Sequence, residues 1–127
     1  MTRVLADTSV WVRHFRRADA ILQSLVSNDR ILVHPLIVLE VACGTPPAPR
    51  DQTLRDLNSL QQAVVATHGE TLALIEKERL HDSGCGAVDV MLLASALLSS
   101  NALLWTDDRH LNALALRLGV AFSPAHQ

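Results

Sequence analysis

The sequence predicts an α/β fold, a three-layer α/β/α sandwich with a mostly parallel sheet of about five strands. Short apolar runs alternate with segments of helical periodicity along the chain, which is typical of a parallel sheet covered by helices on both faces. The chain has 127 residues, of which 49% are hydrophobic, enough to build one full core. We therefore expect a single domain over residues 1–127.

Apolar runs and turn residues indicate the order of the elements. The expected strands cover residues 3–6, 31–34, 63–66, 102–106 and 120–122. Pro35 suits the first turn of a helix, and Gly44 and Gly119 are typical of helix ends. The expected helices cover residues 10–28 (with an interruption near 16–19), 35–44, 53–62, 70–81, 88–99 and 111–118.

Three acidic residues lie in or beside apolar runs, where a core would not normally tolerate them. Asp7 ends an apolar run, and Glu40 and Asp89 lie inside two others that contain no Lys or Arg. A buried and unpaired carboxylate is costly, so such groups are usually protonated, paired or bound to a metal. One shared cation would account for all three acids.

Position in the fold brings these acids toward one place. Asp7 and the doublet Asp107-Asp108 follow predicted strands directly, and ligands of parallel sheets bind at the carboxyl ends of the strands. Helical spacing puts Glu40 and Asp89 on faces that we expect to point inward. Carboxylates suit hard divalent cations, so we predict that Asp7, Glu40, Asp89 and Asp108 bind Mg²⁺ or Mn²⁺ and carry catalysis. Thr106 can orient a ligand through its hydroxyl.

Four segments resemble the motifs of the PIN-domain ribonucleases, and within them the VapC-type toxins of bacterial toxin–antitoxin pairs. They are LADTSVWV at residues 5–12, VLEV at 38–41, VDVMLLASA at 88–96 and LWTDDRHL at 104–111. Any single motif is weak, but four in the family's order over nearly the whole chain are fairly specific. The family usually has a non-acidic residue at the place of Asp107, so whether Asp107 also ligates stays open, and the Thr-x-Asp spacing favours Asp108.

This resemblance implies a cytoplasmic endoribonuclease that depends on Mg²⁺ or Mn²⁺. It also implies an RNA substrate, a homodimer and inhibition by a cognate VapB-type antitoxin. Ser9 joins Thr106 and Asp107 as a supporting residue of the site. Arg13, Arg16 and Arg109 are candidate contacts to RNA phosphates, since local arginines and a metal can offset the formal net charge of −2.

Plainer explanations exist for each feature. Asp7 and Asp108 can simply cap helices, Asp89 can interact with a helix dipole, and Glu40 can face solvent. The arginines can be a solvated helix face. By default, the apolar side chains of residues 10–15 belong to the core, although part of this set can line a groove for a partner helix.

Other functions fit less well. A phosphoryl-accepting α/β protein also clusters acids at strand ends, but Lys77, the one lysine, lies in a predicted helix far from such a site. A binding module with a degenerate site, holding RNA or a protein without cutting, is the other alternative. The histidines lack zinc-site spacing. The apolar run 88–98 is too short to span a membrane, and no signal peptide is expected.

Overall fold

The centre of the fold is a parallel four-stranded sheet with the strand order β3-β2-β1-β4. The computed structural model describes residues 1–124, so the last three residues of the expected domain lie outside the described part. Strand β1 pairs with β2 through Val4–Ile31 and with β4 through Ala6–Trp105. Because all strands run the same way, their carboxyl ends lie at one edge. The strands are β1 (Arg3–Ala6), β2 (Ile31–Val33), β3 (Gln61–Gln62) and β4 (Ala102–Trp105).

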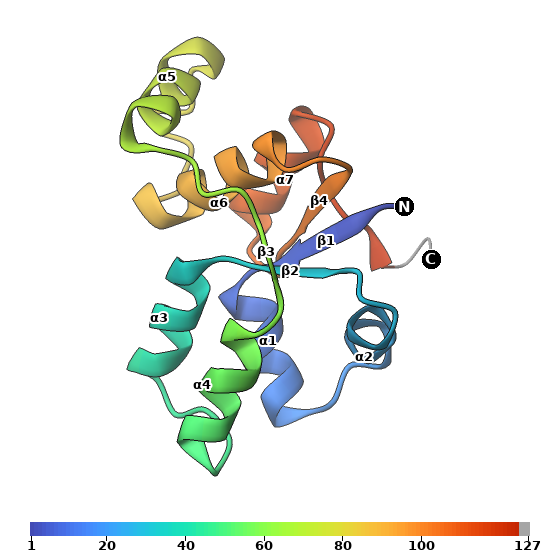
Figure 1. The fold of residues 1–127 in the computed structure, drawn as a ribbon. Coiled ribbons are helices and arrows are strands. Elements are labelled where there is room, and N and C mark those ends of the chain that lie inside the picture. Colours follow the sequence, from blue (N-terminus) through green and yellow to red (C-terminus); the bar gives the residue numbers. More distant parts are fainter. Residues whose placement is uncertain (125–127) are drawn as a thin grey trace.

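Helices cover both faces of the sheet, which confirms the predicted sandwich (Figure 1). One layer contains α1 (Thr8–Arg16), α2 (Ala20–Ser27), α3 (Pro35–Cys43) and α4 (Arg50–Asn58). The other layer contains α5 (His68–Glu78), α6 (Ala87–Leu98) and α7 (Arg109–Arg117). Helix α5 lies farthest from the sheet and packs on α6. Within residues 1–124, no helix combines the length and apolar character needed to cross a bilayer.

Leu, Val, Ile and Ala fill the core, and its centre is the pair β1–β2. Val4, Leu5, Leu32 and Val33 are fully buried because helices cover both faces of these strands. The burial of this central pair keeps the carboxyl edge of the sheet in place.

Two chain breaks explain the helix boundaries of the first layer. The interruption expected near residues 16–19 is present, because Arg17 has extended backbone angles and Asp19 caps α2 by accepting a hydrogen bond from Leu22 N–H at 2.9 Å. Helix α3 begins at Pro35, as predicted, and the buried His34 caps it through Nδ1, which accepts from Leu36 N–H.

The third expected strand is shifted in the structure. Strand β3 comprises only Gln61–Gln62, inside the predicted helix 53–62, and α4 ends at Asn58. Residues 63–66 were expected to be a strand, but the hydroxyls of Ser99 and Ser95 accept the N–H groups of Val64 and Ala66 at 2.9 and 3.2 Å. Ala63 N–H still donates to Val33 C=O of β2 at 2.9 Å, but from Val64 on the segment bonds to side chains of residues 95 and 99 instead of extending the ladder.

The expected fifth strand is reduced to one parallel bridge, Leu104–Ala121. Leu104 N–H donates to Val120 C=O at 2.6 Å, and Phe122 N–H donates to Leu104 C=O at 2.9 Å. Pro124 lacks an N–H group, so a ladder cannot continue through it.

The backbone hydrogen bond that Ser95 of α6 accepts leads to a stability prediction. Ser95 and Ala66 are both buried, so Ser95→Ala leaves the Ala66 N–H without its acceptor. We expect this change to lower the free energy of unfolding by about 1–3 kcal/mol in urea titrations. Ser100→Ala, at an exposed position, is the control and should change it by less than about 0.5 kcal/mol. Equal values for the two variants would contradict this role of Ser95.

Candidate active site

Asp7 is the buried acid of the site, with 5% of its surface exposed. It follows β1 directly and caps α1, since its Oδ1 accepts a hydrogen bond from Val10 N–H at 3.3 Å. Its own N–H donates to Trp105 C=O at 2.9 Å, which continues the pairing of β1 with β4. The helix thus begins at Thr8, two residues before the expected start, with Asp7 as its cap.

Two hydroxyls hold the Asp7 carboxylate from both sides. Ser9 Oγ donates to Oδ1 and Thr106 Oγ1 donates to Oδ2, each at 2.5 Å. The same hydroxyl oxygens accept backbone N–H groups at 3.0 Å, Ser9 from Asp107 and Thr106 from Asp108. Each hydroxyl proton is therefore directed at Asp7, and position 7 needs a side chain that accepts on both oxygens.

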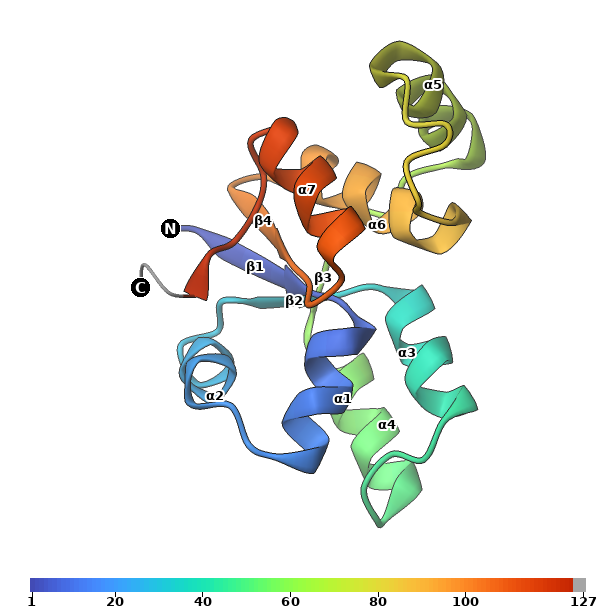
Figure 2. The same cartoon turned by 180° about the vertical axis from the view of Figure 1, so that it is seen from behind.

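This network joins the two strand ends that start α1 and α7. Ser9 belongs to the first turn of α1, and Thr106 directly follows β4. Figure 2 shows the beginnings of these two helices beside each other at the carboxyl edge of the sheet. Ser9 and Thr106, the expected supporting residues, thus both donate hydrogen bonds to Asp7.

Burial raises the pKa of the Asp7 carboxyl above its usual value, although hydrogen bonds from Ser9, Thr106 and the backbone favour the charged form. The geometry therefore holds a carboxylate whose negative charge the surroundings only partly compensate. A nearby positive charge would favour its ionised form.

Asp89 and Asp108 lie close enough to influence each other. Burial raises the pKa of Asp89, the backbone of Gly86 lowers it, and the charges of Asp108 and Glu40 raise it further. Burial likewise raises the pKa of the Cys85 thiol, and both aspartates add to that shift. Asp89 is half-buried in the first turn of α6, and Asp108 is exposed and caps α7 by accepting from Leu111 N–H at 2.9 Å.

Glu40 has a different environment from the one expected. It is exposed, whereas Ile37 and Val41 are the buried residues of α3, so the predicted inward direction of Glu40 is wrong. The side chain nevertheless points to the site, because Thr8 Oγ1 donates to its Oε1 at 2.6 Å. Sequence reasoning missed Thr8, and its place next to Asp7 was the available signal.

Arg13 pairs with two carboxylates of this chain. Its guanidinium contacts Asp107 at 2.6 Å and Asp19 at 2.7 Å and lies over the Trp105 ring. The hydrogen bonds that Arg13 donates to both aspartates raise the pKa of its guanidinium. Asp107 is thus already paired through its side chain, and Arg13 holds α1 against the loop after β4.

The other predicted arginines are open to solvent. Arg16 and Arg109 are exposed, and neither takes part in a salt bridge within residues 1–124. The ring of His110, next to Arg109, packs against Gly84: a Cβ at Gly84 would lie 2.8 Å from it, and the φ of Gly84 is +84°. This contact places the turn before α6 on the start of α7, and sequence reasoning did not detect it.

Each of the four acids offers carboxylate oxygens as metal ligands. None of them forms a salt bridge within the described chain, so their charges are not balanced by Lys or Arg. Such a donor set fits a hard divalent cation. In their present rotamers, however, no three Asp, Glu, His or Cys side chains of residues 1–124 are grouped closely enough to hold one ion.

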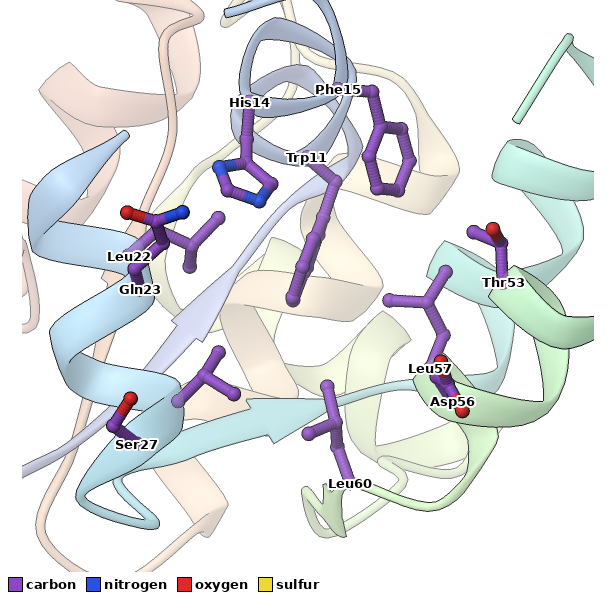
Figure 3. Close-up of a pocket in the computed structure, with 11 residues that line it drawn as sticks. Trp11, His14, Phe15, Leu22, Gln23, Ser27, Thr53, Asp56, Leu57 and Leu60 are labelled. Carbon is purple, nitrogen blue, oxygen red and sulfur yellow. The ribbon is translucent and has the colours of Figure 1, made fainter. Parts of the chain in front are cut away.

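A groove of about 640 Å³ with both apolar and polar lining residues lies between α1, α2 and α4 (Figure 3). Val10 is fully buried, as expected of a core residue. Trp11 and Phe15, which were also expected in the core by default, line this groove together with Leu22 and Leu57. The indole N–H of Trp11 is buried and has no hydrogen-bond acceptor within the described residues. The aromatic side chains of α1 therefore serve both the core and a surface hollow.

Known proteins share both the sequence and the fold of this chain. The chain is 44% identical to Ribonuclease VapC32 of Mycobacterium tuberculosis, in strain CDC 1551 / Oshkosh and in strain ATCC 25618 / H37Rv alike, over 94% of this chain and 96% of the relative. The crystal structure of PAE2754 from Pyrobaculum aerophilum shares the fold, with a TM-score of 0.59 and 19% identity over 93% of this chain and 90% of that one. The PIN domain model matches residues 4–116. The chain therefore belongs to the PIN domain family.

Proposed function

We propose that this PIN domain protein is a metal-dependent endoribonuclease and the toxin of a toxin–antitoxin pair. The observation that carries the proposal is the group of uncompensated carboxylates at the carboxyl edge of the sheet, in a chain 44% identical to Ribonuclease VapC32. Family membership makes a phosphoryl-accepting protein the weaker alternative. A binding module that does not cut RNA is separated from an enzyme by the first experiment below.

The carboxylates have different roles in this proposal. Asp7 is the fixed ligand, since burial and two hydroxyls hold it in place. Glu40 and Asp108 are exposed and can rotate toward an ion, while Asp89 supplies a half-buried oxygen between them. Bound Mg²⁺ or Mn²⁺ would supply a Lewis acid and a water of lowered pKa for hydrolysis of a phosphodiester.

The arginines divide into two groups. Arg16 and Arg109 are exposed and are our candidates for contacts to RNA phosphates. Arg13 and Asp107 already pair with each other, so we assign Arg13 a structural role and prefer Asp108 to Asp107 as the ligand.

We further propose a VapB-type antitoxin partner, a homodimer and a place of action in the cytoplasm. The lining of the groove beside Trp11 combines apolar side chains, such as Leu22 and Leu57, with polar ones, such as Gln23 and Asp56, and this combination suits an amphipathic helix (Figure 3). Exposed leucines on α3, α5 and α6 offer apolar area for a second copy, namely Leu39, Leu72, Leu97 and Leu98.

Metal dependence is the central test. Excess chelator should lower RNA cleavage at least about 100-fold because it removes the metal. Asp7→Asn should lower it to the same extent because it removes the buried carboxylate that anchors the metal. Cleavage is measured on single-stranded RNA, and circular dichroism checks the fold. Asp29→Asn, an exposed position with a φ of 56° that Asn tolerates, is the control and should cleave like the wild type. Full cleavage in excess chelator would exclude the mechanism, and RNA binding without any cleavage would favour a binding module.

Thr106 gives a second, independent prediction. Thr106→Val keeps the shape but removes the hydroxyl between Asp7 and Asp108 N–H, so cleavage should fall about 10- to 100-fold. Thr106→Ser keeps the hydroxyl and should restore most of the rate. Steady-state cleavage at several metal concentrations measures both. If Thr106→Val and Thr106→Ser cleave RNA at the same rate, the hydroxyl does not position the carboxylate.

The raised pKa of Asp89 predicts a pH effect on stability. The pKa of Asp89 is raised in the folded protein, so its contribution to stability is present below pH 3.8 and is lost as pH rises through the folded pKa. In chelator, the free energy of unfolding of Asp89→Asn should therefore increase relative to that of the wild type as pH rises from about 4 to 7. Added Mn²⁺ should raise the free energy of unfolding of Asp89→Asn less than that of the wild type. Urea unfolding at each pH measures this difference. A constant difference across the range, as we expect for Asp29→Asn, would contradict the prediction.

A further inference from the structure

A second hollow, between α1 and α3, starts at the candidate site. Its volume is about 360 Å³, and it is distinct from the groove beside Trp11. Its walls are Val12, Phe15 and Arg16 of α1, Glu40 and Val41 of α3, and the segment 44–47 that follows α3. Glu40 belongs both to this hollow and to the group of carboxylates, so the hollow leads directly away from the site.

The lining combines three kinds of chemistry. Val12 and Phe15 are half-buried, and Val41 is buried, so the inner wall is apolar and includes an aromatic ring. The Phe15 ring is supported by Trp11, with ring centroids 6.0 Å apart. Arg16 is exposed at the rim and forms no salt bridge within residues 1–124. The hollow thus has an apolar interior, a supported ring and a free positive charge.

We propose that this hollow holds one unpaired nucleobase of the RNA, next to the nucleotide whose phosphate meets the carboxylates, and this rests on the proposed function. Unpaired bases are bound by aromatic side chains and apolar walls, while arginine contacts the backbone phosphate. Glu40 lines the hollow and is also one of the candidate acids, so a base in the hollow would lie next to the site. Arg16 supplies a positive charge that can pair with an RNA phosphate. The volume lies at the lower end of the range for small-ligand sites, which suits one base.

The proposal also predicts which form of RNA binds. A base in a duplex is stacked and paired and cannot enter a side pocket without leaving the helix. The protein should therefore prefer single strands, and the lining of the hollow should affect which base precedes or follows the cut.

Gly44 offers a way to close the hollow without disturbing the site. Its φ is −98°, outside the left-handed region that favours glycine, and a Cβ there meets only the carbonyl oxygens of Val41 and Glu40, at 3.6 and 4.0 Å. Gly44→Leu should therefore fit and occupy space in the hollow. Gly69→Leu is the matched control, because Gly69 lies on α5, outside this hollow, and a Cβ there meets only Thr67 Oγ1, at 4.0 Å.

The main measurement is binding of short single-stranded oligo(A), oligo(C) and oligo(U) in excess chelator, which needs no cleavage. Stacking on an aromatic ring accounts for roughly a fivefold or larger gain in affinity, so Gly44→Leu should bind at least about fivefold more weakly. Gly69→Leu should bind like the wild type. Arg16→Gln should weaken binding to all three oligomers and reduce its salt dependence.

Cleavage separates this proposal from the proposed function. If the wild type binds single strands but cuts no RNA, the proposed enzyme fails while the binding experiment still tests the hollow. If Gly44→Leu folds, binds and cuts like the wild type, the base pocket is wrong and the enzyme stands. If that variant loses only binding of a cognate antitoxin peptide, the hollow belongs to a protein contact and the proposal is again wrong.

A second variant covers a failure of Gly44→Leu to fold. Val12→Ala enlarges the hollow at its half-buried wall. We expect it to change the order of affinities among the three oligomers. An unchanged order, with unchanged affinities, would overturn the base pocket.

Discussion

The hydrogen bonds that Ser9 and Thr106 donate to Asp7 are the constraint on which the site depends. They join the end of β1 to the end of β4, and through the N–H groups of Asp107 and Asp108 they also set the start of α7. Because every hydroxyl proton in this network is directed at position 7, only a carboxylate satisfies all the donors there. The best-buried acid of the site is thus also its most rigid one, and the parallel pairing of β1 with β4 determines its place. The place of this carboxylate and the geometry of the sheet edge are therefore parts of the same arrangement.

Most of the fold could be predicted, and the reasons are local. The alternation of apolar runs and helical segments predicted the parallel sheet, and Pro35 predicted the start of α3. The failures occur where side chains compete with the backbone for hydrogen bonds. Residues 63–66 have strand-like composition, but Ser95 and Ser99 accept their N–H groups. Two hydroxyls on a distant helix leave no sign in the local pattern, so the position of β3 could not be read from it.

The places of the candidate residues along the sheet edge were predictable, but their exposure and pairing were not. Strand ends located Asp7 and Asp108 at one edge, because parallel strands share that edge. Helical spacing gave the wrong direction for Glu40, since α3 is apolar on several sides and its buried side is decided by packing. Arg13 looked like a contact for RNA, but Asp19 and Asp107 approach it from elsewhere in the chain. Motif reading identifies which residues gather, while exposure and pairing depend on tertiary contacts.

The surroundings of the carboxylates also explain why a cation is the better partner than a basic residue of the chain. A lysine or arginine placed among Asp7, Asp89 and Asp108 would balance part of their charge. The guanidinium of Arg13 instead pairs with Asp19 and Asp107. Burial raises the pKa of Asp89, and the charges of Asp108 and Glu40 raise it further, so ionising all of these acids together carries an electrostatic cost. An added positive charge close to them would lower that cost.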